Sequence, residues 1–481
     1  MTRSSLLSCA LAFCLPVATF AQTPAPPVAL PDSPVGRAVG LFVTALNSGS
    51  LVALEKFHKD RGGDPEAAQQ DLQFAEQSGG LELRKVAKAS DFEIDVEAVT
   101  RGAGRAVMLH FVVEPTPPHP VADIGVRPLG APGPGGPDAP GGPGGPGGGG
   151  PQSGPRPAAD VIAGAPALVD AAIAVGFSGA VLIAKDGKPV LERASGLANR
   201  SFEVKNRIDT KFNLGSINKT FTKLAIAQLM AEGKLSLDDK LGKFLPDFPN
   251  ADAAAKVTIA HLIEMKSGLG DFFGREFDQA PKNWIRTLAD YVPFFAKKPL
   301  AFEPGTAEAY SNGGYLTLGL IIEKVSGQTY YDYVRDHIFK PAGMADTDYY
   351  ELDAVTSNLA VGYVRRNASN MYALPARGSS AGGGYSTAPD LLKYAEALLA
   401  GRLVSMPYTR WYLGGPRPDE AKAPAPAATE PLRGGLGIAG GSPGVNAVLE
   451  INAAQRLVIV VLTNDDAPAA EDLARKIRRG N

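Results

Sequence analysis

The stretch Ser216-Ile217-Asn218-Lys219 opens a mainly apolar segment just before the midpoint of this 481-residue chain. Residues three apart on a helix share a face, so this spacing places the Ser216 hydroxyl beside the Lys219 amine. A serine hydroxyl is a poor nucleophile near neutral pH and needs a base within hydrogen-bond reach. Lys219 can be that base if burial and its neighbours lower its pKa. The same spacing also arises by chance in a solvated helix turn. The surrounding sequence therefore has to distinguish a catalytic pair from a chance one.

The residues that follow Ser216 predict a buried helix that runs to about Glu232. Apolar side chains dominate its second half, and Gly233 is typical of the residue just after a helix C-terminus. Ser216 would then lie at the N-terminal end of the helix. There the helix dipole and the free backbone N–H groups favour a developing negative charge.

A second motif, Tyr310-Ser311-Asn312, lies in a predicted loop before a helix that ends near Gly327. Such a loop could hold a phenol and an amide toward Lys219, the phenol carrying a proton and the amide gripping a substrate carbonyl. The alternative is an ordinary turn with a packed tyrosine and a capping asparagine. The motif by itself leaves both interpretations open.

The composition excludes some classes of partner. The formal net charge is −2, and we find no basic stripe of the kind that nucleic-acid binders carry, so no nucleic-acid partner is expected. No segment reaches the roughly 20 apolar residues of a spanning helix, so no transmembrane span is expected. The oligomeric state stays open.

The N-terminus has the pattern of a secretory signal peptide over residues 1–21. Arg3 precedes an apolar run over residues 6–17, and Ala21 ends a small-residue cleavage site. Both cysteines, Cys9 and Cys14, lie in this segment, so the mature chain would lack disulfides, thiol catalysis and thiolate metal sites. The alternative of a lipid-bearing Cys14 is disfavoured by the bulky Phe13 before it. The expected location is periplasmic or secreted.

Three regions follow the signal peptide. Residues 32–128 predict a small α+β domain, with helices over 35–46 and 64–77 and strands over 91–97 and 106–113. Its layout resembles nuclear transport factor 2-like domains. Residues 130–158 are almost entirely Gly, Pro and Ala, which indicates a disordered linker, a plain spacer rather than a binding segment. Residues 160–481 form the remaining domain, where Asp186-Gly187 predicts an early hairpin and residues 446–451 and 457–463 a late one.

This last domain resembles the serine β-lactamase and penicillin-binding-protein superfamily, particularly its class C β-lactamase and esterase-like branch. The resemblance covers roughly residues 160–475 and rests on separate motifs in the family's order. These are Ser216 to Lys219, Asp238-Asp239-Lys240-Leu241, His261-Leu262-Ile263 through Ser267-Gly268-Leu269, Phe302-Glu303-Pro304-Gly305, Tyr310-Ser311-Asn312 and Gly343-Met344. It implies an α+β fold, with an antiparallel sheet flanked by helices and an all-helical lobe.

The resemblance also implies a mechanism without metal or cofactor. Ser216 would attack an acyl carbonyl, Lys219 and Tyr310 would move its proton, and Asn312 would orient the substrate. The backbone N–H of Ser216 and one from the late strand, around Gly440 and Gly441, would form the oxyanion hole. From the residues alone, no His, Asp or Glu set shows metal-ligand spacing. His261 and His337 lie in predicted apolar helices, where core packing is expected rather than a Ser-His-Asp triad.

The chain departs from the family at its third motif, where Ile438 stands in place of the usual Lys or His. A cation there would pair with a substrate carboxylate, and losing such a hydrogen bond costs about 1.5–3 kcal/mol. We therefore expect an esterase-like enzyme for small ester, amide or peptide substrates rather than a β-lactamase or D-alanyl carboxypeptidase. The alternative from another class is a catalytically weak binder of cell-wall peptides or acylated ligands. The intact Ser216, Lys219, Tyr310 and Asn312 favour the enzyme.

Overall fold

The computed structural model describes residues 28–61, 67–102, 106–128, 156–364, 368–418 and 431–480. These residues form two compact units, one within Met1–Ala131 and the other within Pro132–Asn481. The predicted signal peptide (1–21) and all but the last three residues of the predicted linker (130–158) lie outside the described residues.

The first unit is a small α+β fold with a four-stranded antiparallel sheet in the order β1-β2-β3-β4. Its elements are α1 (Pro34–Asn47), α2 (Leu51–Asp60), α3 (Ala67–Ser78), β1 (Leu81–Ala89), β2 (Glu93–Thr100), β3 (Ala106–Val113) and β4 (Val121–Pro128). Sequence patterning predicted α1, α3, β2 and β3. It missed α2, β1 and β4, because β1 is largely exposed and carries little periodic signal.

Strands β2 and β3 alternate between buried and half-buried residues, as their sequence predicted. Their buried side chains form one core with α1, in which Phe42 packs against Phe111. His110 faces away from this core, as expected from its place between Leu109 and Phe111, and its Nδ1 lies 2.8 Å from Asp95 Oδ1 on β2.

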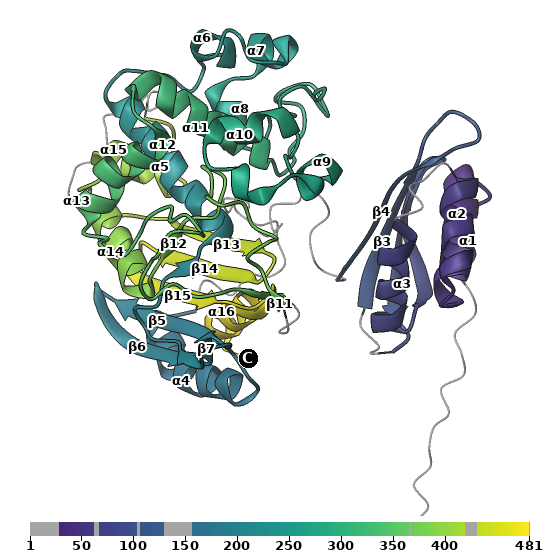
Figure 1. Ribbon diagram of the computed structural model, residues 1–481, viewed down its shortest axis with the longest axis horizontal. Helices are drawn as coiled ribbons and strands as arrows, with labels where there is room; N and C mark the ends of the chain where they lie inside the picture. The colour runs from purple at the N-terminus through teal and green to yellow at the C-terminus, as the bar shows by residue number, and fades with distance from the viewer. Residues whose placement is uncertain are drawn as a thin grey trace, which may run out of the picture. The chain divides into compact units, whose positions relative to one another are not determined.

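The second unit is built on a five-stranded antiparallel sheet in the order β13-β14-β15-β5-β6 (Figure 1). The strands are β13 (Gly435–Ser442), β14 (Val445–Asn452), β15 (Leu457–Thr463), β5 (Gly179–Lys185) and β6 (Lys188–Ser195). Both ends of the domain therefore contribute to one sheet, as predicted. Asp186 and Gly187, both with positive φ, form the two-residue turn between β5 and β6, which is the turn that a right-twisted hairpin favours.

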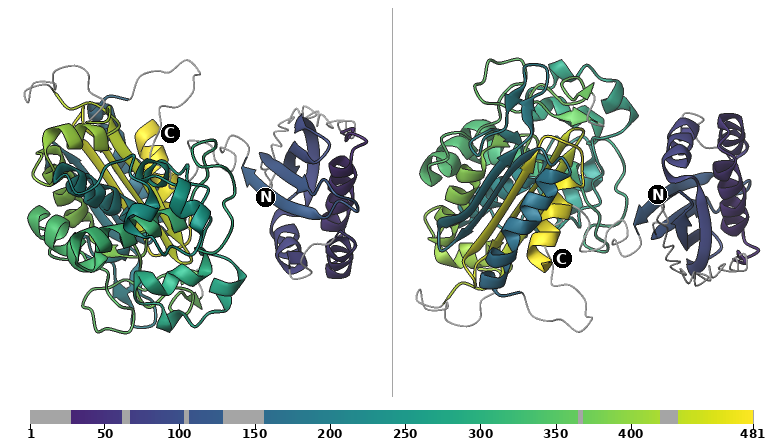
Figure 2. Two further views of the ribbon diagram at one scale, coloured as in Figure 1. Left: turned by 90° about the horizontal axis from the view of Figure 1, so that it is seen from above. Right: turned by 90° about the horizontal axis from the view of Figure 1, so that it is seen from below.

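Two helices cover one face of this sheet. Figure 2 shows α4 (Ala158–Ala174) and α16 (Ala469–Arg479) side by side across it. Val181, Ile183 and Val461 point into the core beneath them, while the alternate residues Ala180 and Leu182 point into the larger core on the opposite face. The central strands are thus apolar on both faces, which explains their continuous hydrophobic sequence.

The larger core holds the remaining helices, which include the predicted all-helical lobe. In Figure 1, α6, α7, α8 and α10 lie beyond α5 and α11 from the sheet. The helices are α5 (Asn218–Ala231), α6 (Leu241–Phe244), α7 (Ala251–Lys256), α8 (Ile259–Ile263), α9 (Arg275–Gln279), α10 (Leu288–Tyr291), α11 (Asn312–Ser326), α12 (Tyr330–Val334), α13 (Lys340–Ala342), α14 (Ala388–Leu399) and α15 (Met406–Tyr412). Short strands β7 (Leu197–Asn199), β8 (Val204–Lys205), β9 (Phe212–Asn213), β10 (Tyr363–Val364), β11 (Ala368–Ser369) and β12 (Tyr385–Ser386) form two-stranded pairs in the connections.

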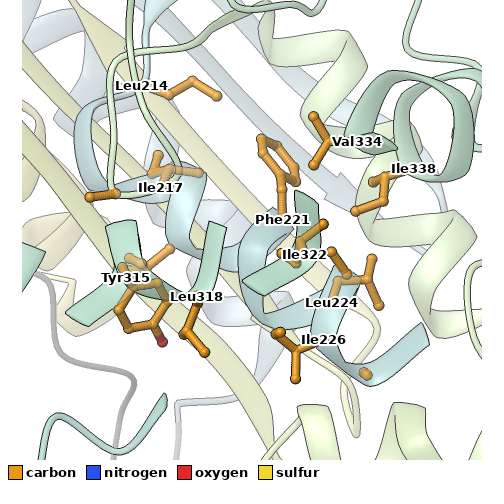
Figure 3. Close-up of a cluster of buried hydrophobic side chains, with 14 of the residues drawn as sticks. Leu214, Ile217, Phe221, Leu224, Ile226, Tyr315, Leu318, Ile322, Val334 and Ile338 are labelled. Atoms are coloured by element: carbon orange, nitrogen blue, oxygen red, sulfur yellow. The ribbon is translucent and has the colours of Figure 1, made fainter. Parts of the chain in front are cut away.

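Helix α5 is the centre of this core and is buried on nearly every side. Figure 3 shows Phe221 and Leu224 of α5 among side chains from α11, α12 and the turn before α13. The Phe221 ring makes edge contacts with Phe339 and Tyr394, at 5.0 Å between centroids in both cases. A helix held this firmly is a rigid platform for the residues at its N-terminal end.

Two local expectations are corrected by the structure. Ser216 lies in a 3₁₀ turn (Gly215–Ile217), and the α-helix begins only at Asn218. His337 is exposed and stacks on Tyr333 rather than packing in the core. His261 is half-buried on α8, where its ring and the Thr258 side chain cap the helix N-terminus reciprocally.

Among the helices of the described residues, none is both long and apolar enough to cross a membrane.

Candidate active site

Ser216 is presented by a tight turn that is pressed against the sheet edge. Gly215 has a φ of +49°, and a Cβ on it would lie 2.7 Å from the backbone nitrogen of Gly441 on β13. Only glycine combines this backbone conformation with such a close approach. The turn therefore brings the Ser216 hydroxyl and its backbone N–H to the end of strand β13.

Lys219 lies one turn into α5, and its side chain is buried with three oxygen partners. Its Nζ is 2.7 Å from Ala381 O, 2.7 Å from Asn312 Oδ1 and 3.0 Å from Ser216 Oγ. A neutral amine has two hydrogens and one lone pair. The two carbonyl oxygens can only accept, so they take both N–H groups and leave the lone pair facing the Ser216 hydroxyl.

Burial lowers the pKa of Lys219 to about 7, against an opposing effect from the negative charge of Asp271. Taking an ammonium out of water disfavours its charged form, which is the main cause of the shift. At neutral pH a large fraction of Lys219 is therefore the free amine. This is the state in which it accepts the Ser216 proton.

The orientation of the Asn312 amide is fixed from its other side. Its Nδ2 donates to Asp271 Oδ2 at 2.6 Å, which leaves Oδ1 for Lys219. Asn312 is the first residue of α11, and Ser311 caps that helix by accepting from the Gly314 N–H. The amide carries a second N–H, and Asn312 lines the cavity in front of Ser216. Asn312 thus orients Lys219 as well as having the position to contact a substrate.

Tyr310 brings its hydroxyl to 2.5 Å from Ser216 Oγ, and its ring lies 4.6 Å from Lys219 Nζ. Burial raises the pKa of this phenol further above the neutral range. Tyr310 is therefore a proton donor at neutral pH rather than a base. The structure thus divides the two roles that the sequence left shared: Lys219 can remove the proton and Tyr310 can supply one.

The oxyanion hole is formed by backbone alone. Gly441 lines the cavity beside Ser216, while Gly440 is buried against the turn, where a Cβ would lie 2.0 Å from Leu214 O and 2.8 Å from Ser216 N. Gly440 therefore allows the close approach of β13, and Gly441 offers its N–H to a bound oxygen. Two backbone donors aimed at one point are what a tetrahedral oxyanion needs.

Asn446 on β14, which the sequence did not single out, holds this peptide in place. It is fully buried, and its Nδ2 donates to Gly440 O at 3.2 Å and to Glu471 Oε1 at 3.0 Å. The C=O of Gly440 and the N–H of Gly441 belong to one planar trans peptide and point in opposite directions. Fixing the carbonyl toward Asn446 therefore aims the Gly441 N–H away from β14, toward Ser216.

A cavity of about 320 Å³ opens in front of Ser216. Its lining is largely aromatic and aliphatic, with Phe272, Phe273, Phe277, Tyr350 and Leu374 among its residues, and it also includes Ala439, Gly441, Ser442 and Glu471. Among the described residues that line it, Glu471 alone carries a charged side chain. Sequence patterning found Tyr310 but none of these phenylalanines nor Tyr350, because they carry no motif and are brought to Ser216 by the fold.

Ile438 faces away from this cavity. It lines a separate small cavity with Lys219, Lys223, Tyr315 and Tyr412. The interpretation of Ile438 as a missing contact to a substrate carboxylate stays a prediction, and the structure adds that this side chain lies beside two buried lysines. Burial lowers the pKa of Lys223 to about 8, and its Nζ donates to Tyr412 O at 3.2 Å.

Outside this site, the sheet of the first unit brings three ionisable residues together. Glu93, Asp95 and His110 have potential ligand atoms within 4.8 Å of one another, a grouping that follows from the pairing of Asp95 with His110 across strands and that sequence spacing did not reveal. Asp95 already bonds His110, and Glu93 pairs with Lys88 at 2.7 Å. These contacts are those of a cross-strand ion-pair network.

The fold and the arrangement of Ser216, Lys219 and Tyr310 are those of a serine hydrolase. The sequence profile of the family described as Beta-lactamase matches residues 132–480. This chain therefore belongs to the Beta-lactamase family.

Individual relatives are similar over parts of their length. The chain is 36% identical to Penicillin-binding protein 4* of Bacillus subtilis (strain 168) over 204 residues, 41% of this chain and 44% of that protein. It thus spans about half the length of this curated relative. The crystal structure of a penicillin-binding protein from Bacillus halodurans is 30% identical with a TM-score of 0.56, covering 65% of this chain and 98% of that one. The crystal structure of D-amino acid amidase from Ochrobactrum anthropi SV3 is 23% identical with a TM-score of 0.55, and the match covers 67% of this chain and 97% of that one. The two proteins share the fold.

The pH dependence of catalysis tests Lys219 as the base. We expect kcat/KM for a neutral ester to fall with pH below about 7, because protonation of Lys219 removes its lone pair. Asp271→Asn keeps an oxygen for the Asn312 amide but removes the negative charge that raises the Lys219 pKa, so the midpoint of this fall should move to lower pH. Asp247→Asn, an exposed acid elsewhere, is the control. An upward shift in Asp271→Asn, or no fall at low pH in the parent enzyme, contradicts the assignment.

Asn446 gives a second test. Asn446→Ala should lower kcat about tenfold or more with a smaller change in KM, because the Gly441 N–H loses its fixed direction. Asn446 Oδ1 also accepts from the Ala470 N–H at the start of α16. The control is therefore Asn250→Ala, which likewise removes a side chain that accepts from the N-terminus of a helix, and which should cost about 1 kcal/mol of stability without lowering kcat. Steady-state kinetics of both variants measure the change in kcat, and denaturant unfolding measures the change in stability. Equal loss of kcat in the two would refute a specific role for Asn446.

Proposed function

We propose that this protein is an exported serine hydrolase that forms an acyl-enzyme on Ser216 and cleaves small ester or amide substrates. The observation that carries the proposal is the Lys219 amine, whose two N–H groups are taken by carbonyl oxygens and whose lone pair faces Ser216 Oγ at 3.0 Å. A protein that only bound its ligand would gain nothing from a free amine held in this way.

The reaction would run in two halves. Ser216 Oγ attacks the acyl carbon while its proton passes to Lys219, and the oxyanion is bound by the N–H groups of Ser216 and Gly441. The carbon–leaving group bond then breaks as the leaving atom takes a proton from Tyr310, which recovers one from Lys219. In the second half, water attacks the acyl carbon and gives a proton to Lys219. The bond from the acyl carbon to Ser216 Oγ then breaks as Oγ takes this proton back, which releases the acid and restores the Ser216 hydroxyl and the free amine.

The charge of the cavity supports the choice of substrate class. The described residues that line it include no lysine, arginine or histidine, so a substrate carboxylate finds no cation there. Such a contact is worth about 1.5–3 kcal/mol where it exists. This favours esters and amides without that group over penicillins and D-alanyl peptides, although penicillin-binding proteins are among the relatives. Export rests on the signal-peptide pattern of residues 1–21.

The experiment compares a p-nitrophenyl alkanoate with a fluorescent penicillin. We expect turnover of the ester, an acyl adduct on Ser216 by mass spectrometry, and a loss of kcat/KM of at least about 10³-fold in Ser216→Ala, since the nucleophile is removed. Unchanged turnover in Ser216→Ala would overturn the proposal. A stable penicillin adduct without ester turnover would favour a penicillin-binding protein instead. For export, the protein recovered outside the cytoplasm should have a mass that corresponds to a chain beginning at Gln22.

A further inference from the structure

Glu471 introduces a single negative charge into an otherwise uncharged reaction cavity. It lies in the first turn of α16, half-buried, and lines the cavity together with Gly441, Ser442 and Ala467. Through Asn446 it is two hydrogen bonds away from the Gly440–Gly441 peptide: Glu471 Oε1 to Asn446 Nδ2 at 3.0 Å, and Nδ2 to Gly440 O at 3.2 Å. Glu471 thus shares the reaction cavity with Ser216 and is linked through Asn446 to the peptide that supplies the Gly441 N–H.

The carboxylate is not neutralised by its own surroundings. In the described part of the chain it accepts from Asn446 and forms no ion pair. Arg475 acts on it by charge at a distance, but the guanidinium of Arg475 is bonded to Asp472. A carboxylate has two oxygens with about four acceptor positions, and the bond from Asn446 uses one of them. The remaining capacity is available to a group in the cavity.

Burial raises the pKa of Glu471, and the charge of Asp472 adds to the effect. A partly desolvated carboxylate without a cation is costly to keep ionised, and an incoming cation offsets that cost. An acid in the first turn also complements the helix dipole of α16. That role needs no contact with the cavity, and Asp472, the next residue, can fill it.

We propose that Glu471 binds a protonated amine of the substrate, so that the enzyme selects acyl esters or amides with an ammonium group close to the reacting carbonyl. This inference rests on the proposed function and narrows its substrate class. The same cavity also has an apolar lining, in which Phe272, Phe273 and Phe277 are in mutual ring contact. An apolar side chain fits against them. The substrate that matches both the charge and the apolar lining is an ester or amide of an apolar or aromatic amino acid.

The test uses three methyl esters of one shape: phenylalanine methyl ester, in both enantiomers, methyl 3-phenylpropanoate without the amine, and the monomethyl ester of benzylmalonic acid with a carboxylate in its place. All are assayed at about pH 6.5, where an α-amine is largely protonated. The parent enzyme should prefer at least one phenylalanine ester over the neutral ester, and the neutral ester over the carboxylate.

Glu471→Gln is the informative variant, because its amide oxygen can still accept from Asn446. The ratio of kcat/KM for the preferred phenylalanine ester to that for the neutral ester should fall at least tenfold, and the carboxylate ester should improve. Asp472→Asn is the matched control: it removes a charge from the same helix turn, from a residue that does not line the cavity, and should leave the ratio within about twofold.

Three results would contradict the proposal that Glu471 binds the ammonium group of the substrate. The parent enzyme could turn over the neutral ester with no preference for the ammonium ester. Glu471→Gln could lower both rates equally, which would mean that Glu471 acts only through Asn446. Asp472→Asn could reduce the preference for the phenylalanine ester as much as Glu471→Gln does, which would mean that the preference comes from negative charge at the start of the helix rather than from Glu471 itself. If Ser216→Ala retains full activity on all three esters, the proposed function itself fails and the subsite falls with it.

Discussion

The burial of the Lys219 amine is the constraint on which the site depends. Its three oxygen partners come from segments that are far apart in the chain: Ser216 from the turn before α5, Asn312 from the start of α11, and Ala381 from the loop before β12. An amine removed from water must have its hydrogens satisfied. Packing the two carbonyl oxygens around it therefore fixes the free lone pair toward Ser216 and joins the two helices to the loop at the same time.

A second constraint is the contact between the Ser216 turn and the edge of the sheet. Strand β13 is the edge strand, and its outward backbone groups are not used by the ladder. An exposed edge is normally a liability because it invites pairing. Here Gly215 and Gly440 let the turn approach so closely that the edge becomes one side of the reaction cavity. The Gly441 N–H, which the ladder leaves outward, is thereby placed where it can act as the predicted oxyanion donor, and Asn446 holds the carbonyl on the other side of the same peptide.

Local sequence patterns predicted those contacts and turns that form between residues close together in the chain. The Ser216 and Lys219 spacing predicted that the two side chains meet, and Asp186-Gly187 predicted the first hairpin of the sheet. Tyr310 and Asn312 were connected to Lys219 by the family resemblance, because no rule of spacing joins residues about 90 positions apart. Asp271, Asn446 and Glu471 were missed for a related reason: each acts through a contact made by the fold, and a lone Asp, Asn or Glu in a loop, strand or helix start has no pattern of its own. His337 was placed wrongly because an apolar stretch does not reveal which side of a short helix is exposed.

The two lysines beside Ile438 give a further consequence of having no cation at this position. The sequence predicts that an isoleucine in place of a cation removes a contact to a substrate carboxylate. In the structure its side chain lies with Lys219 and Lys223 on the interior side of β13. Both lysines have pKa values lowered by burial, and a third cation there would lower the Lys219 pKa further by repulsion. An apolar residue at 438 is therefore compatible with keeping the base poised near neutral pH. Under the proposed subsite, selection of the substrate by charge passes to Glu471, which lines the reaction cavity with Gly441, and a substrate carboxylate in that cavity meets a negative charge instead of a partner.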